Sequence, residues 1–176
     1  MNAWHDIDIK RITPREFVAC IEIPKGSQCK YELDKESGML ILDRVLSTST
    51  MYPANYGFIP KTYADDNDPL DVLVLCKETI APMTLVKCYP IGVMIMIDNG
   101  QLDEKIIAIA EKDMMWNSYH NLDDLPPHYI NEVKNFFEVY KMLEGKYTYI
   151  DKTLGREDAY RIIEEAIWKY KEKFEK

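Results

Sequence analysis

The sequence predicts an α+β protein that is mainly β, in which a small, closed or nearly closed β-barrel carries two helices on its outside. Short apolar runs, separated by breaks that contain Pro or Gly, fill the first two thirds of the chain, and helical spacing replaces them in the last third. With 176 residues, 47% of them hydrophobic and 30% charged, the chain is long enough to bury a sizeable core. We therefore expect a single domain over residues 1–176.

The expected strands begin with residues 17–23. Residues 30–34 and 39–45 follow, and the Gly-containing turn between them is typical of a hairpin. After a segment rich in Pro and Tyr, further runs of strand length occur at residues 72–76, 85–89, 93–98 and 106–110. Many short strands of this kind favour a barrel.

Two helices are expected at the end of the chain. After the pair Pro126-Pro127, apolar residues recur at helical spacing from 130 to 143, and Gly145 follows them. A second helix over residues 156–174 has one apolar stripe. We interpret the aromatic residues of both stripes as core.

Composition limits the classes of partner. A formal net charge of -8 disfavours nucleic acid or an anionic membrane surface as the main partner, although a local basic pocket could still bind a small anion. Residues 1–10 lack the apolar region of a secretory signal, and the apolar stretch 91–97 is too short to span a bilayer. The cysteines form no CxxC pair and indicate a reducing compartment, so we expect a cytoplasmic protein whose thiols are Cys20, Cys29, Cys76 and Cys88.

The most informative segment is acidic and runs from Asp65 to Asp71, directly ahead of the apolar run 72–76. Carboxylates packed this closely repel each other, and a hard divalent cation bound through oxygen relieves the repulsion. The alternative is a solvated acidic loop. An EF-hand fails because, counting from Asp66, Asp71 falls where Gly is needed and Lys77 falls where Glu is needed.

A second acidic group lies between two expected strands, so that Asp98 and Asp103 flank one turn. Taken alone, this is an ordinary hairpin. Two Asp-bearing edges in one small barrel are compatible with a site for several cations, provided that the edges converge.

Basic side chains could hold an anion beside such cations. Lys30 and Glu32 share one face of a strand because side chains alternate. The pair Asp43-Arg44 lies at the end of an apolar run, and Tyr140-Lys141 lies near the end of the first helix. Each alone is equally explained by an exposed strand position or by the helix dipole. Together in one pocket, they would bind a phosphate-rich anion through charge-assisted hydrogen bonds.

Residues 51–60 combine Tyr52, Asn55 and Tyr56 with Pro and Gly. We expect a loop whose rings cover the mouth of the barrel and whose hydroxyl groups could donate to an oxyanion. The chain has no Gly-rich phosphate loop and no G-x-S-x-G motif. No metal-ligand or triad spacing involves the histidines, so no function is assigned to His5, His120 and His128.

In order and spacing, these segments resemble the soluble family I inorganic pyrophosphatases over nearly the whole chain. The signature-like segment is Asp66–Asp71, and the other matching segments are Ile21–Pro24, Lys30–Glu32, Asp34–Gly38, Asp43-Arg44, Tyr52–Gly57, Asp98–Lys105 and Tyr140-Lys141. The compact length resembles the prokaryotic-type branch, whose members are commonly hexamers. A homo-oligomer is therefore expected by resemblance.

The resemblance implies Mg²⁺-dependent hydrolysis of pyrophosphate to two phosphates, by direct in-line attack of an activated water, in an OB-like five-stranded barrel. By similarity, Asp66, Asp71 and Asp103 ligate a first metal, and Asp71 bridges to a second. Asp98 joins Asp103 at a metal that arrives with the substrate, and Glu32 serves another one largely through water.

The resemblance also implies roles in proton transfer and phosphate binding. Asp68 is similar to the residue that takes a proton from the nucleophilic water, and Tyr56 lies among the acids and phosphates. Glu22 and Tyr52 lie further out, and Asp65 receives no role. The implied phosphate clamp is Lys30, Arg44, Lys105, Tyr140 and Lys141.

Two other classes remain open from the residues themselves. An OB-type barrel that binds single-stranded nucleic acid would use the aromatics, but the charge of -8 and the acidic edges disfavour it. A non-catalytic cation-binding module would explain the acids, yet it leaves Lys30, Arg44 and Lys141 without a joint purpose.

Overall fold

The computed structural model describes all residues, 1–176. Its strands are β1 (Phe17–Ile23), β2 (Cys29–Leu33), β3 (Leu40–Val45), β4 (Asn55–Phe58), β5 (Asp71–Leu75), β6 (Leu85–Asp98), β7 (Gln101–Ala110) and β8 (Thr148–Gly155). Its helices are α1 (Pro127–Val139) and α2 (Arg156–Phe174), with short 3₁₀ turns at η1 (Ile9–Arg11), η2 (Leu122–Asp124) and η3 (Met142–Glu144). Neither α-helix has the length and apolar character that a bilayer crossing requires.

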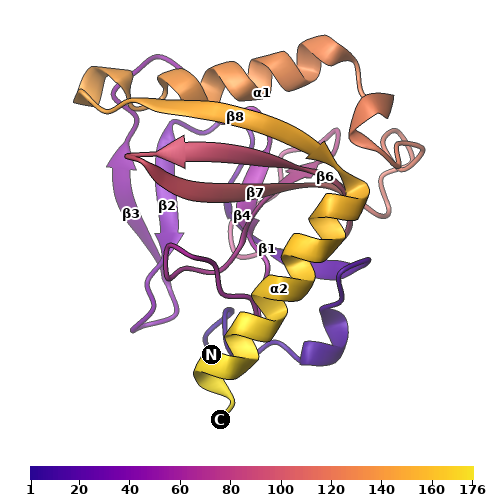
Figure 1. Cartoon of the computed structure of the whole chain (residues 1–176). Helices are drawn as coiled ribbons and strands as arrows, with labels where there is room; N and C mark the ends of the chain where they lie inside the picture. The colour runs from indigo at the N-terminus through magenta and orange to yellow at the C-terminus, as the bar shows by residue number, and fades with distance from the viewer.

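Five strands form a ring of hydrogen-bonded neighbours in the order β1-β4-β5-β7-β6, which closes because β6 also pairs with β1. Every pairing in the ring is antiparallel except that of β5 with β7, which is parallel. Strand β8 adds to β6, while β2 and β3 form a separate hairpin beside the ring (Figure 1).

The ring is buried on both faces. Along β5, Val72 and Val74 pack into a core cluster that includes buried residues of α2, whereas Leu73 and Leu75 pack into a second cluster with α1. Alternate residues of a strand point to opposite faces, so a strand covered on both sides needs an unbroken apolar run. The two helices cover different parts of the ring, with α1 running above β8 and α2 crossing in front (Figure 1).

The mainly β class, the ring of five strands and the two helices agree with the expectation from sequence, and α2 covers the expected residues 156–174. One prediction was wrong in the middle of the chain. Residues 55–58 were expected in a loop but form β4, because they pair with β1 on one side and β5 on the other. Strand β8 was not anticipated.

Several boundaries also differ, and the strand expected at residues 106–110 begins at Gln101 as β7. Residues 85–98 form one strand instead of two, since a register shift between Pro90 and Gly92 accommodates the proline, which lacks an N–H. Helix α1 ends at Val139 rather than near Gly145, and Leu143, expected on the apolar stripe, is exposed.

Candidate active site

A cavity of about 550 Å³ opens between the β2–β3 hairpin, the acidic loop ahead of β5, and the β6–β7 turn. Its charged lining is mostly negative, with twice as many carboxylates as lysines. The carboxylates are Glu22, Glu32, Asp34, Asp66, Asp68, Asp71, Asp98 and Asp103, and the lysines are Lys30, Lys35, Lys105 and Lys141.

The centre of the cavity is a buried network around Lys105. Its ammonium nitrogen lies 2.9 Å from Asp71 Oδ2, 3.2 Å from Asp103 Oδ2 and 2.7 Å from the hydroxyl oxygen of Tyr56. Tyr56 in turn donates to Asp71 Oδ2 at 2.6 Å. The sheet produces this convergence, because Asp71 and Lys105 are direct partners across the β5–β7 ladder and Tyr56 comes from the adjacent β4.

Burial and charge oppose each other in this network. Burial alone would lower the pKa of Lys105, but Asp103 and Asp71 outweigh it and raise that pKa above its ordinary value, so the lysine is charged. Burial raises the pKa of Asp66, and the nearby charge of Asp71 adds to the rise. The acids are therefore short of positive charge even with Lys105 among them.

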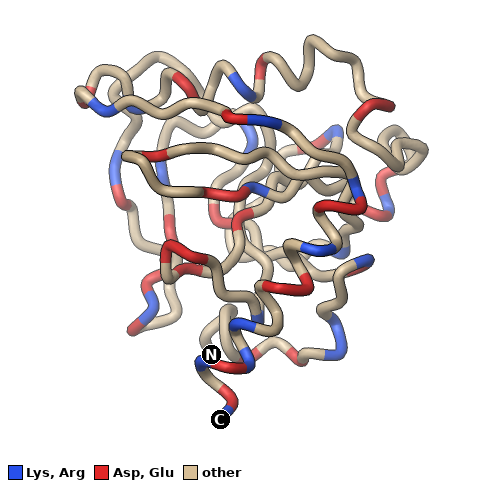
Figure 2. The backbone as a smooth tube through the Cα atoms, in the orientation of Figure 1, with Lys and Arg blue, Asp and Glu red and all other residues tan.

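The acidic loop ahead of β5 is folded back on itself. Asp66 Oδ1 accepts from the backbone N–H of Asp68 at 3.1 Å, and Asn67 adopts a left-handed conformation with φ of 68°. The side chain of Asp68 is half exposed and contacts Lys35 from the β2–β3 turn. This loop is a red stretch of the tube between that hairpin and α2 in Figure 2.

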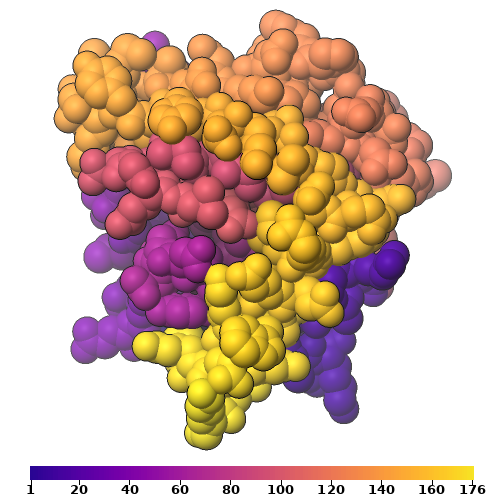
Figure 3. Space-filling view, in the orientation of Figure 1, coloured from indigo at the N-terminus to yellow at the C-terminus, as the bar shows by residue number.

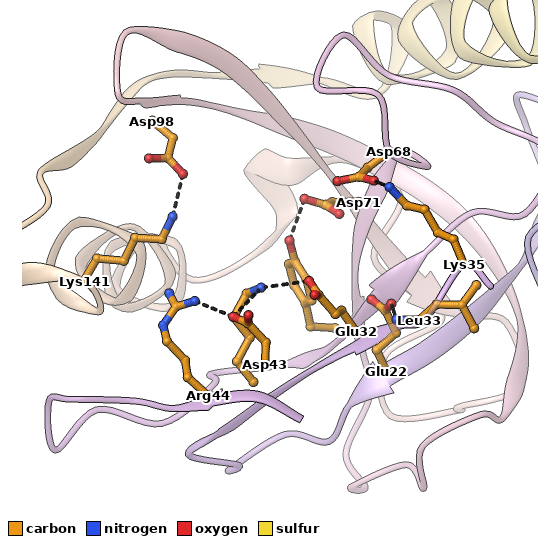
Figure 4. A network of polar contacts seen from close by, with 12 residues as sticks. Glu22, Glu32, Leu33, Lys35, Asp43, Arg44, Asp68, Asp71, Asp98 and Lys141 are labelled. Carbon is orange, nitrogen blue, oxygen red and sulfur yellow. Dashed lines mark hydrogen bonds and ion pairs between the residues drawn. The ribbon is translucent and has the colours of Figure 1, made fainter. Parts of the chain in front are cut away.

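The β2–β3 hairpin supplies a second charged group, drawn in Figure 4. Lys30 Nζ lies 3.5 Å from Glu32 and 3.3 Å from Asp43, and Arg44 donates to Asp43 at 2.5 Å. Arg44 Nε is also 3.0 Å from a carboxylate oxygen of Glu144, without the alignment of a hydrogen bond, and its buried Nη2 has no partner. Arg44 thus keeps unused donors.

The end of α1 faces the β6–β7 turn. Lys141 Nζ lies 2.6 Å from Asp98 Oδ2 (Figure 4), and Tyr140 beside it is buried against Phe136 and Phe137. Both Lys141 and Tyr140 line the cavity.

On the opposite wall of the cavity, Glu22 Oε1 accepts from the backbone N–H of Leu33 at 2.7 Å. Burial raises the pKa of Glu22 to about 8. If Glu22 is protonated, its carboxyl group is neutral and the cavity carries one negative charge fewer.

The structure brings nearly all of the predicted site residues to this one cavity. Arg44 and Tyr52 do not line it. Tyr52 is buried against Tyr56 and Phe136, where it supports the wall from behind. Sequence reasoning missed Lys35 and Trp4, which do line the cavity, because nothing local indicates that the hairpin turn and the N-terminus fold toward the acidic loop.

The donors suit a hard cation such as Mg²⁺, because the cavity offers many carboxylates and no histidine or cysteine. In this arrangement the acids pair with lysines, and no three of them form a ready cluster. Each implied ligand still has an oxygen without a protein donor, since the contacts use only Oδ1 of Asp66 and Oδ2 of Asp71 and Asp103. These residues therefore fit such a cation.

Comparison with known proteins identifies the family to which this fold is similar. The family model described as inorganic pyrophosphatase matches residues 19–171. Soluble inorganic pyrophosphatase 2 of Chlamydomonas reinhardtii is 45% identical over 174 residues, covering 98% of this chain and 90% of that protein. Soluble inorganic pyrophosphatase 1 of Arabidopsis thaliana is 43% identical over 171 residues, covering 97% of this chain and 81% of that protein.

Solved bacterial structures share the fold. The inorganic pyrophosphatase of Thermus thermophilus superposes with a TM-score of 0.93 at 34% identity, covering 97% of this chain and 99% of that one. The enzyme of Helicobacter pylori gives a TM-score of 0.90 at 39% identity, covering 94% of this chain and 99% of that one. Similar proteins thus come from plants, an alga and bacteria, and assignment to the prokaryotic-type branch stays a prediction.

Proposed function

Because this chain belongs to the soluble family I inorganic pyrophosphatases and hydrolyses inorganic pyrophosphate, we propose that the reaction takes place in the cavity around Lys105 and Asp71. The observation that carries the proposal is the lining itself, in which a majority of carboxylates surrounds buried and half-buried lysines. Such a lining suits a polyanionic substrate that arrives with divalent cations. A nucleic-acid-binding barrel and a non-catalytic module do not fit a chain of this family.

In this proposal Mg²⁺ is held by Asp66, Asp71 and Asp103, with Asp98 and Glu32 serving cations that accompany the substrate. When bound there, Mg²⁺ neutralises phosphate charge and makes the attacking water more acidic. Supporting this assignment, Asp66, Asp71 and Asp103 keep oxygens free of protein donors.

Asp68 is proposed to accept the proton of the attacking water. It lies on the cavity wall with a half-exposed side chain, and its carboxylate is held by Lys35 rather than by buried donors. A carboxylate that is reachable from the cavity and is paired only with an exposed lysine can take up a proton. No covalent intermediate is required, so water attacks phosphorus directly and in line with the leaving phosphate.

The phosphate groups are proposed to be held by charged donors on three sides of the cavity. Lys30 and Arg44 come from the hairpin, Lys141 follows α1, and Lys105 lies at the centre. Hydroxyl groups of Tyr56 and Tyr140 complete the set. As negative charge develops on the leaving phosphate, such positioned donors stabilise it most. Tyr52 supports these residues from behind, and Glu22 lies on the cavity wall beside them without a contact to phosphate.

Three broader expectations belong to the same proposal. The ring of five strands is the OB-like barrel of the family, and the protein acts in the cytoplasm. The chain forms a homo-oligomer, by resemblance a hexamer, and the exposed apolar side chains of Leu42 and Val45 on β3, which do not line the cavity, are available for self-association. Sedimentation that shows only monomer at micromolar concentration would contradict the oligomer.

The central test measures phosphate release from pyrophosphate. We expect turnover with Mg²⁺, none with EDTA, and at least about a hundredfold lower kcat in Asp68→Asn, the usual scale for losing a general base. Asp123→Asn is the matched control, since Asp123 is exposed in η2, outside the cavity lining. Unchanged turnover in Asp68→Asn would remove Asp68 from its role, and no release from the wild-type protein would overturn the proposal.

A further inference from the structure

Asp65 stands beside the proposed ligands but is held by a different part of the chain. Its Oδ1 lies 2.8 Å from Nζ of Lys169, on the second half of α2. The two residues are 104 positions apart in sequence. In Figure 3 the segment around residue 65 packs directly against the lower half of α2, which agrees with this contact.

Two further contacts fasten the same loop. The backbone N–H of Tyr63 donates to the carbonyl oxygen of Ala166 in α2 at 3.0 Å. The hydroxyl group of Tyr63 donates at 2.6 Å to Oδ1 of Asn67, the residue in the left-handed conformation. The loop is therefore attached to α2 on the side that faces away from the cavity.

We propose that Lys169 and Asp65 are positioning residues, through which α2 holds the acidic loop in the shape that presents Asp66 and Asp68 to the cations. This inference rests on the proposed function of the loop. The carboxylates of Asp66, Asp68 and Asp71 repel each other, so an unattached loop would spread and would have to be ordered again when a cation binds. An external attachment orders the loop beforehand.

Lys169 permits a test in which two explanations predict opposite signs. If Lys169 acted only through its charge, its removal would leave the acids more negative and would tighten cation binding. If it positions the loop, its removal loosens the loop and weakens cation binding. The direction of the change therefore separates the explanations, whatever its size.

The experiment titrates the full-length protein with Mg²⁺ by calorimetry. We expect Lys169→Met to weaken binding about two- to fivefold, the scale of an exposed ion pair, and Lys169→Arg to restore it. Glu165→Gln is the control, because Glu165 also lies 2.8 Å from Lys169 Nζ but makes no hydrogen bond to the loop. Equal or tighter binding in Lys169→Met would overturn the inference.

A second measurement does not depend on a loaded enzyme. Hydrogen exchange without Mg²⁺ should become faster at the amides of Asn67 and Asp68 in Lys169→Met and in Asp65→Asn, but not in Glu165→Gln. Unchanged exchange at these amides would count against the attachment. Asp71→Asn distinguishes failure of the proposed metal site from failure of the loop attachment. If wild type and Asp71→Asn bind Mg²⁺ equally, the proposed function of the site fails, and the inference fails with it.

Discussion

Lys105 and Asp71 are direct partners across the only parallel pairing of the ring, with their charged atoms 2.9 Å apart and the lysine side chain almost entirely buried. Removing one member of a buried pair leaves the other charge uncompensated. We expect Lys105→Met to lower the free energy of unfolding by about 3 kcal/mol in EDTA, measured by urea unfolding.

Mg²⁺ should reduce that loss, because a bound cation compensates the carboxylates that Lys105 leaves behind. The exposed Lys152→Met on β8 is the control and should stay within about 0.5 kcal/mol of wild type in both buffers. An equal loss with and without Mg²⁺ would argue that no cation reaches Asp71 and Asp103.

Arg44 does not line the cavity, yet its buried Nη2 has no partner. If that nitrogen binds a phosphate oxygen, Arg44→Lys should raise the KM for pyrophosphate about tenfold, since lysine cannot reproduce the geometry of the guanidinium. Steady-state kinetics of Glu144→Gln provide the comparison. A similar rise in that variant would indicate that Arg44 only braces the hairpin against η3.

Stability should fall in mild acid because of His5. Burial lowers the pKa of His5, and Lys61 contributes to the shift. The unfolded chain then binds a proton that the folded protein does not bind, so this stability is present above the ordinary histidine pKa and is lost as the pH falls from there through the lower pKa of the folded state. Between pH 7 and pH 5, the melting temperature of the wild type should fall further than that of His5→Gln. An equal fall in both proteins would refute this prediction.

Gly57 allows β4 to approach β1 closely. A Cβ at this position would lie 1.9 Å from the carbonyl oxygen of Cys20. Gly57→Ala should therefore cost about 3 kcal/mol or more, because backbone must move to relieve the overlap. Gly155→Ala meets no atom within 4 Å and is the control for chemical denaturation. Comparable stability of the two variants would mean that the strands can separate without cost.

Gly57 also explains one limit of the sequence prediction. The segment around it contains Pro, Asn and Gly, which locally favour a turn, and only pairing with both β1 and β5 makes it a strand. Strand β8 has a mainly polar pattern and depends in the same way on β6. By contrast, the buried run of β5 and the apolar stripe of α2 carry their signal within a few neighbouring residues, so sequence located them well.

In the candidate site, too, residues with a local sequence signal differ from those that depend on tertiary contacts. The acids of residues 66–71 could be predicted because they are adjacent in sequence, and family resemblance added the distant members as predictions. Lys35, Trp4 and the attachment of Asp65 to Lys169 were not found, since each depends on tertiary contacts between segments that have no local pattern in common.

The parallel pairing of β5 with β7 affects when the enzyme can become active during folding. Asp71 and Lys105 are 34 positions apart, and β6, which separates them in sequence, must take its place between β7 and β1. Contacts of such long range form late, after the entropy of closing the loop has been overcome. A chain still emerging from the ribosome therefore carries its acids without their lysine, and catalytic competence should not arise before the ring has closed.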